Sequence, residues 1–161
     1  MTLEELEAVG ITRMDETAID DFLRNRGFGV LGLPDEATPY LLPMSYGFDG
    51  ESLFFTYLLG EASRKEALSE RADAASFLVS AADSPFRWQS VLLTGTIDAV
   101  TPSAFEAAVD QASTPWRPAI FREASLSRGV EFYRFGIDER SGVKHTGLPP
   151  ALVADPAADD R

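Results

Sequence analysis

LFFTYLLGEASRK, residues 53–65, predicts a short apolar strand, a turn at Leu59–Gly60 and the start of a helix. Ser63, Arg64 and Lys65 stand where that helix begins. A helix start presents free backbone N–H groups and the positive end of the helix dipole, so it favours anions, phosphate in particular. A hydroxyl, a guanidinium and an ammonium group add three further kinds of phosphate donor. The stretch therefore predicts a site for a phosphate-type anion.

The composition of the chain limits the partners that it can have. Its 161 residues suit one domain with a substantial core, and 26 acidic against 14 basic residues give a formal net charge of -12. This balance argues against a nucleic-acid partner, which needs a basic surface. Excess acid is explained by solubility or, since lysine occurs only at positions 65 and 144, by adaptation to high salt. A small anionic ligand would need a local basic cluster.

Several kinds of site and location are not expected from the residues present. The absence of cysteine excludes disulfides, thiolate metal sites and cysteine nucleophiles. The N-terminal MTLEELEAVG lacks the pattern of a signal peptide, and no apolar run approaches the roughly 20 residues of a membrane helix. We therefore expect a cytoplasmic protein without a membrane partner. His145 has no second metal-type ligand nearby, so no metal site is predicted.

Apolar runs and turn signals predict a mainly β domain with peripheral helices. The six expected strands cover residues 28–33, 40–48, 52–57, 74–81, 88–100 and 130–137. Helices are expected at residues 15–26, 62–71, from 101 onward and at 120–127. Asp49–Gly50 predicts a tight hairpin, and Gly95 predicts a bend or bulge. Because helices do not alternate with the strands, we expect an antiparallel barrel and not a doubly wound parallel sheet.

The ends of this domain are expected to differ from its centre. Residues 1–12 predict one or two acidic helical turns, and Gly27 is expected to end the helix that follows them. From Ser141 the chain loses its strand pattern. We expect the domain to cover residues 1–145 and residues 146–161 to form a mobile acidic tail.

Two further segments are candidates for the wall of the anion site. The run PMSY, residues 43–46, interrupts an apolar strand, and proline there predicts an edge or a ligand-facing position. Thr56 and Tyr57 place a hydroxyl and an aromatic ring just before the turn. Since the two strands are expected to pair as a hairpin, these groups would line one groove. Core packing of Met44 and Tyr46 is the alternative.

The cationic cluster itself also has a plain explanation. Arg64 and Lys65 are one turn or less from Glu61 and Glu66, and such neighbours form ordinary surface ion pairs. Spacing alone does not choose between a surface ion pair and an anion site.

The order of PMSYGFDGESLFFTY, ASRK, AASFLVS and WQSVLLTGTIDAV resembles the pyridoxamine 5'-phosphate oxidase-like, FMN-binding split-barrel superfamily over about residues 15–140. FTYLLGEASRK is similar to the family motif of threonine, a short loop and Ser-Arg-Lys that binds the FMN phosphate. SVLLTG is similar to the family's QVxVxG strand. The resemblance implies a six-stranded antiparallel split β-barrel and a homodimer with two FMN molecules at its interface.

The resemblance also implies roles for residues around the phosphate. Ser63, Arg64 and Lys65 would bind the phosphate, and Thr56 and Tyr57 would lie beside the phosphate and the ribityl chain.

Other matched residues would surround the flavin ring. Met44 and Ser45 would present backbone to the ring, and Ser90 matches the family's glutamine that reaches the cofactor from the partner subunit. Gln89 is one residue away from that register, which reverses its face on a strand. Trp88 would place an aromatic ring near the flavin.

One departure from the family separates this chain from pyridoxamine phosphate oxidases proper. Those enzymes carry a C-terminal Arg-x-His type substrate motif, and neither Arg134 nor Lys144–His145 has matching spacing. The acidic, short chain is more similar to the branch that includes nitroimidazole-resistance-type flavoproteins, so strict pyridoxamine phosphate oxidase activity is not expected.

Three functions follow as hypotheses. The first is an FMN-dependent oxidoreductase, in which the flavin exchanges electrons with a small-molecule donor and acceptor. The second is a carrier or sensor that binds flavin or F420 without turnover. The third is a structural dimer without flavin, in which Ser63, Arg64 and Lys65 are surface residues.

Overall fold

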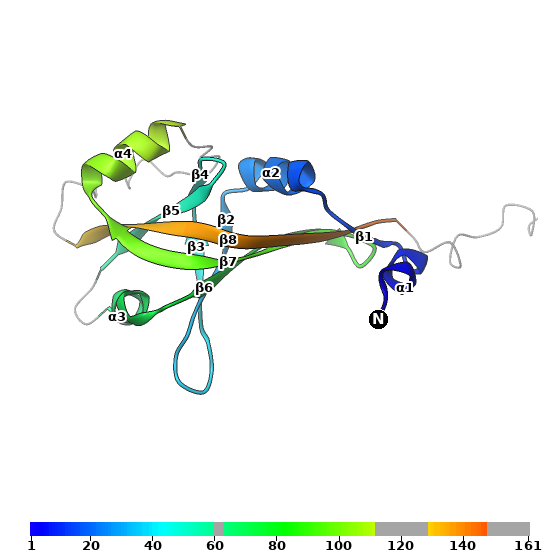
Figure 1. Ribbon diagram of the computed structural model, residues 1–161, viewed down its shortest axis with the longest axis horizontal. Coiled ribbons are helices and arrows are strands. Elements are labelled where there is room, and N and C mark those ends of the chain that lie inside the picture. Colours follow the sequence, from blue (N-terminus) through cyan, green and yellow to red (C-terminus); the bar gives the residue numbers. More distant parts are fainter. Residues whose placement is uncertain (60–62, 112–128, 148–161) are drawn as a thin grey trace, which may run out of the picture.

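The computed structural model describes residues 1–59, 63–111 and 129–147 (Figure 1). In this part of the chain four helices accompany eight strands, and every strand pair is antiparallel. The elements in chain order are α1 Leu3–Ala8, β1 Ile11–Arg13, α2 Glu16–Asn25, β2 Phe28–Leu33, β3 Tyr40–Ser45, β4 Gly47–Phe48, β5 Ser52–Leu58, α3 Arg64–Arg71, β6 Ala75–Ser84, β7 Arg87–Val100, α4 Pro102–Gln111 and β8 Val130–Thr146.

The strands form one sheet in the order β3-β2-β6-β7-β8-β5-β4, with β1 added beside β8. The two ends of this order, β3 and β4, are consecutive in the chain and are separated only by Tyr46. The two edge strands are therefore joined through the chain and not by hydrogen bonds between strands. A sheet that curves round but stays open in this way is a split barrel. The mainly β fold is confirmed. Eight strands replace the expected six because residues 40–48 divide at Tyr46 and β1 was not predicted.

Tyr46, the residue that connects β3 to β4, is held in place by two hydrogen bonds. Its backbone N–H donates to the Gly27 carbonyl at 2.9 Å, and its hydroxyl donates to the Leu23 carbonyl at 2.9 Å. Leu23 is in the last turn of α2, where carbonyl groups lack partners within the helix. The ring is only 3% exposed and stands edge-on to Phe77 at 5.5 Å, and its burial raises the pKa of the hydroxyl. One residue thus joins α2, the start of β2 and the core.

Side chains on the inner face of the sheet fill the barrel. Phe55, Phe77 and Phe135 are fully buried, and their ring centroids lie 5.1 to 6.4 Å apart. A second, smaller cluster lies on the outer face beneath α4, where Phe105 stacks on Phe132 at 4.2 Å. Alternation along β5 and β8 supplies both clusters, because successive side chains of a strand point to opposite faces.

Helix α2 follows its sequence signals closely. The Asp15 side chain accepts a hydrogen bond from the Ala18 N–H at 2.8 Å, and one face buries Ile19, Phe22 and Leu23. The helix ends at Asn25 because Arg26 is already extended, with φ of -109° and ψ of 165°. Gly27 was expected to end the helix in a left-handed conformation, but its φ is not positive. The expected position of the helix end is therefore nearly right, and the expected role of Gly27 is wrong.

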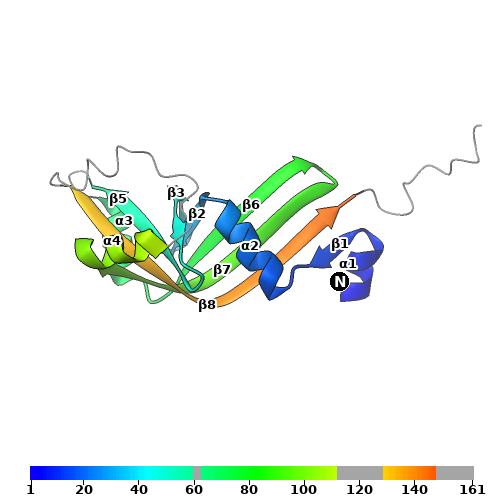
Figure 2. The same ribbon diagram turned by 90° about the horizontal axis from the view of Figure 1, so that it is seen from above.

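The long strands β6, β7 and β8 continue past the barrel as a wing, which we define as residues 79–94 and 139–146 (Figure 2). Strand β6 runs to Ser84 and the chain turns at Pro85–Phe86, so the expected loop at 83–85 is right at Pro85 and wrong at residues 83 and 84, which are still in the strand. Strand β8 runs to Thr146, which corrects the expected end at residue 137.

A bulge explains why the end of β8 was missed. Thr94 pairs with Glu139 while Gly95 pairs with Ile137, which leaves Asp138 without a partner on β7. The alternation of β8 changes phase at this point, so a period of two cannot be followed through it. The irregularity expected at Gly95 is confirmed: a Cβ atom there would lie 1.9 Å from the Gly136 carbonyl oxygen.

His145 fastens the N-terminal segment to the wing. It is 5% exposed on β8, with Nδ1 2.7 Å from the Phe86 carbonyl oxygen and Nε2 2.9 Å from that of Val9. Gly10, with φ of +85°, leaves room for the ring, since a Cβ there would lie 3.2 Å from it. In this structure His145 joins α1, the β6–β7 turn and β8, and no group of metal-ligating residues occurs among the described residues.

Some expectations lie outside the described residues: the turn at 113–118, the helix at 120–127 and the tail from residue 148 onward. Thr146, assigned to that tail, is instead the last residue of β8. Among the described helices, none has the length and apolar character needed to cross a membrane.

We predict that Tyr46→Phe lowers the free energy of unfolding by about 1–2 kcal/mol, because it leaves the buried Leu23 carbonyl without a partner. Urea unfolding followed by circular dichroism measures the change. Tyr40→Phe is the matched control, since the half-buried Tyr40 contributes its ring to a contact with Arg64. Equal stability of the two variants would contradict the role given to the Tyr46 hydroxyl.

Candidate functional site

The predicted anion site is centred on the first turn of α3. The helix begins at Arg64 with Ser63 as its N-cap, close to the expected start at residue 62. The Ser63 side chain makes no capping hydrogen bond, so its hydroxyl does not satisfy any N–H group of the first turn. These N–H groups and the hydroxyl can therefore donate to a ligand.

Lys65 lies against the barrel and not in open solvent. Its Nζ is 5.3 Å from the centroid of the Tyr57 ring, and desolvation lowers the pKa of the ammonium group. No carboxylate lies within 4.0 Å of it in the part of the chain that the structure describes, so the expected pairing with Glu66 does not form. Glu61, the other expected partner, is outside the described residues.

The support under Lys65 is rigid. Tyr57 is fully buried, its hydroxyl shares a 2.8 Å hydrogen bond with Ser69 of α3, and its ring stacks on Tyr133 at 4.2 Å. Burial raises the pKa of Tyr57 to about 12, an effect that the hydrogen bond to Ser69 partly opposes. These contacts fix α3 on β5 and β8, so the position of Lys65 against the Tyr57 ring is defined.

Arg64 has a partner that the sequence did not indicate. Its guanidinium forms an ion pair with Asp35, in the β2–β3 turn, and lies over the Tyr40 ring at 5.4 Å. The Arg64 side chain is 64% exposed, whereas that of Asp35 is 16% exposed. Arg64 is thus turned toward the β2–β3 hairpin, and it would have to share or leave Asp35 to reach an anion at the start of α3.

Thr56 and Tyr57 do not act together in this chain. As neighbours on β5 they point to opposite faces, and only Tyr57 contacts Lys65. Thr56 is half-buried on the face that also carries Phe54 and α4.

The groove expected between residues 40–48 and 52–57 is not a simple hairpin groove. Strand β3 pairs with β2, and only the short β4 pairs with β5. Met44 is 8% exposed in the main core, as the alternative interpretation expected, while Ser45 is half-buried on the outer face. Pro43 is on β3, at one end of the sheet order, so the edge position predicted from proline is confirmed.

Trp88, Gln89 and Ser90 lie on β7 in the wing, where they pair with residues 145, 144 and 143 of β8. Ser90 and Trp88 share the outer face with the exposed Leu92, whereas Gln89 shares the opposite face with the buried Val91. Ser90 and Gln89, which differ by one position in the sequence, therefore point to opposite faces of β7. Ser90 is on the outer face and Gln89 is on the face toward α2.

The two groups of predicted site residues are far apart within one chain. Thr56 is opposite Phe132 and Ser90 is opposite Val143, so eleven residues of β8 separate them, 143 minus 132. At about 3.3 Å per residue this separation is on the order of 30 Å. A single chain does not bring Ser63, Arg64 and Lys65 together with Ser90.

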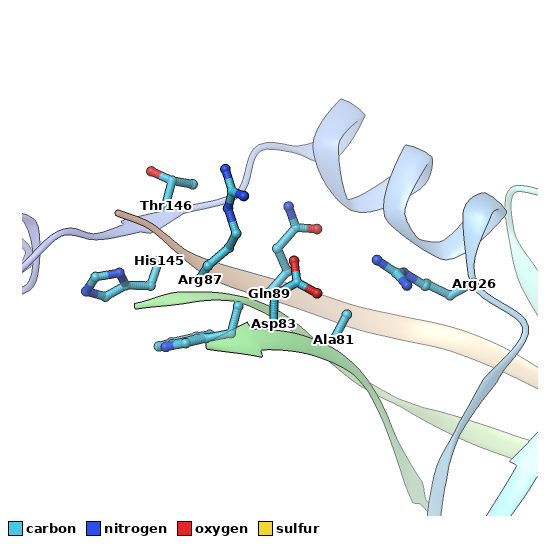
Figure 3. Close-up of a pocket in the computed structure, with 8 residues that line it drawn as sticks. Arg26, Ala81, Asp83, Arg87, Gln89, His145 and Thr146 are labelled. Carbon is cyan, nitrogen blue, oxygen red and sulfur yellow. The ribbon is translucent and has the colours of Figure 1, made fainter. Parts of the chain in front are cut away.

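A pocket of about 270 Å³ lies on the α2 side of the wing (Figure 3). Arg87 and Gln89 line it from β7, and Arg26 reaches toward them from the end of α2. Sequence reasoning missed Arg26 and Arg87 because they are 61 positions apart and meet only through the packing of α2 on the wing.

Solved structures with the same fold include three whose names concern flavins or drug resistance. A FAD-binding protein from Mesorhizobium loti has a TM-score of 0.69 and 17% identity, covering 85% of this chain and 98% of its own. The FAD binding protein from Mycobacterium smegmatis has a TM-score of 0.63 and 17% identity, covering 84% and 100%. A candidate 5-nitroimidazole antibiotic resistance protein from Bacteroides thetaiotaomicron has a TM-score of 0.62 and 15% identity, covering 84% and 89%. At these identities the likeness establishes the fold.

The family of the chain follows from its sequence. No curated protein matches it. The model of the family described as pyridoxamine 5'-phosphate oxidase matches residues 15–144, a span that begins at the cap of α2 and ends near the end of β8. It includes β3, β5, the start of α3 and the wing, where the predicted site residues lie. The chain belongs to the pyridoxamine 5'-phosphate oxidase family.

Proposed function

We propose that this protein is a flavin-dependent oxidoreductase that binds FMN, with the phosphate at Ser63, Arg64 and Lys65. The family and the FAD-binding proteins of the same fold support a flavin. The observation that carries the proposal is the state of Lys65, which is partly desolvated at a helix start and has no carboxylate partner among the described residues. In a chain of net charge -12, such a cation is best explained by an anionic ligand.

The residues at the start of α3 fit a phosphate group. The dipole of the helix, the Ser63 hydroxyl and the Lys65 ammonium all favour negative charge at one position. A bound phosphate would restore to Lys65 the charge stabilisation that burial removes. FMN and FAD share this phosphate, so the same residues would serve either cofactor, and we propose FMN because the matched motif binds its phosphate.

A bound flavin supplies the redox chemistry, since its ring accepts and returns electrons. The chain would then fix the phosphate at α3 and limit access of water to the ring, with a small molecule as electron donor or acceptor. One observation distinguishes an enzyme from a flavin carrier without turnover. In an enzyme, NADPH bleaches the bound flavin rapidly and repeatedly in the presence of an acceptor, and in a carrier it does not.

We also propose that two copies of the chain complete each site. The outer face of the sheet carries a continuous apolar row, because Pro43, Val30, Leu78 and Leu92 are successive partners across β3, β2, β6 and β7. Leu78 is 38% and Leu92 45% exposed, which favours a contact with another protein surface. Ser90 is on this same face, so a second copy docked there would bring its Ser90 toward the flavin.

Replacing both Arg64 and Lys65 with alanine is expected to weaken FMN binding by at least about 100-fold, since two charge-assisted contacts to the phosphate are lost. Flavin absorbance that stays with the protein after gel filtration measures the change. Arg71→Ala is the matched control, because Arg71 is on the same helix and its Nε donates to the Ala67 carbonyl at 3.2 Å. Unchanged flavin retention in the double variant would refute the phosphate assignment.

The two lysines of the chain allow a second test within one sample. At about pH 8 an acylating reagent should modify Lys65 efficiently, because a lowered pKa leaves more of its amine neutral. Added FMN should protect Lys65 and leave Lys144 unaffected. Mass spectrometry of the two peptides gives both extents, and equal labelling of Lys65 with and without flavin would count against a phosphate at this position.

Glutamate at positions 78 and 92 is expected to convert the dimer to a monomer, since it places charge in the middle of the apolar row. Light scattering measures the mass, and the same variant should lose flavin. Leu3→Glu is the control, because Leu3 is equally exposed but lies on α1. A monomeric wild-type chain that still retains flavin would contradict the two-copy site.

A further inference from the structure

The pocket on the α2 side of the wing is distinct from the start of α3. Its residues that bear on ligand binding are Arg26, Asp83, Arg87, Gln89 and Thr146. A second cavity of about 250 Å³ adjoins it, shares Arg26 and Gln89, and adds Lys144. Each cavity is slightly smaller than the roughly 300 Å³ at which small-molecule sites begin, and the two share two lining residues.

Three cations on these walls have no ionic partner in the part of the chain that the structure describes. Arg24, Arg64 and Arg140 each form an ion pair with a carboxylate, but among the described residues no carboxylate lies within 4.0 Å of the side-chain nitrogens of Arg26, Arg87 or Lys144. Asp83 and Asp21 also line the two cavities, and neither neutralises a cation at contact distance. Within the described residues, the charges of these three side chains are therefore not neutralised by a carboxylate.

The sheet register brings these donors together. Arg87 pairs with Thr146 and Gln89 pairs with Lys144, so four donor side chains stand on two neighbouring rows of one face. Rows on the same face are two residues apart, about 7 Å, which a phosphate and its neighbouring groups can span.

Arg26 completes the group from the other side of the pocket. It lies just beyond the last residue of α2, and its guanidinium stacks on the Phe22 ring at 5.3 Å. Figure 3 shows it reaching toward the side of the strands that carries Arg87 and Gln89. Helix α2 is held on the wing by the hydrogen bond from the Met14 N–H to the Gly142 carbonyl at 2.8 Å and by ion pairs of Arg140, so this arrangement is part of the fold.

We propose that this pocket binds a small molecule that carries a phosphate group, with the phosphate between Arg26 and Arg87. Guanidinium groups suit phosphate because they donate in a planar fork. Gln89 and Thr146 add neutral donors on the same face of the sheet as Arg87. The site does not depend on the flavin phosphate, which belongs to α3, and Trp88, which the resemblance places near the flavin ring, is on the opposite face of β7.

The test is a calorimetric titration of the full-length chain with ADP at low ionic strength, with and without FMN. Arg26→Ser combined with Arg87→Ser should weaken ADP binding at least 30-fold. Both arginines are exposed, so the double variant should keep the circular dichroism spectrum and melting temperature of the wild type. Arg71→Ala controls for the loss of surface charge, and the Arg64 and Lys65 double alanine variant controls for binding at α3.

The outcomes separate this site from the proposed flavin site. Loss of ADP binding in the Arg26 and Arg87 variant alone supports the proposal, whether or not the chain retains flavin. Loss only in the Arg64 and Lys65 variant, equal small losses in all variants, or no binding by the wild type would overturn it. Inorganic pyrophosphate should bind with the same dependence on Arg26 and Arg87, and ADP binding without any pyrophosphate binding would contradict the assignment of the phosphate to these two residues.

Discussion

The hydrogen bonds of Tyr46 are the constraint on which the rest of the structure depends. A single residue connects the two edge strands of the sheet, and its N–H and hydroxyl groups attach this connection to Gly27 and Leu23. The same contacts set where α2 ends and where β2 begins. Because β4 follows Tyr46 and pairs with β5, the crossing also positions β5, and β5 carries the Tyr57 ring on which Lys65 lies.

The charge distribution gives the candidate site its character. The chain has 26 acidic against 14 basic residues, yet among the described residues no carboxylate lies within 4.0 Å of the partly desolvated Lys65 ammonium, whereas Arg64 forms an ion pair with Asp35. An incoming phosphate would compete with Asp35 for Arg64 and would meet no carboxylate of the described residues at Lys65. We therefore expect Lys65 to contribute most of the affinity for phosphate, and we expect the contribution of Arg64 to depend on how far it leaves Asp35.

Local signals in the sequence were enough to predict the local structure. The caps and apolar spacing of α2, the strand at residues 28–33, the start of α3 and the irregularity at Gly95 all followed from neighbouring residues. Other features depend on the register between segments that are distant in the sequence, and a local pattern does not contain that information. They are the connection through Tyr46, the pairing of β1 with β8 and the extension of β8. For the same reason the Asp35 partner of Arg64 and the meeting of Arg26 with Arg87 were not predicted. The family motif selected Ser63, Arg64 and Lys65, and their role in binding stays a prediction.

The most direct test of the account is a mixed dimer, because the central claim is that one chain supplies the phosphate site and its partner supplies Ser90. One chain carries alanine at positions 64 and 65, and the other carries Ser90→Glu, which places a carboxylate beside the flavin. Each variant alone should bind no flavin. The purified mixed dimer should bind half of the wild-type amount, because one of its two sites has both parts intact. A mixed dimer without flavin, or a Ser90→Glu homodimer with full flavin content, would contradict the account.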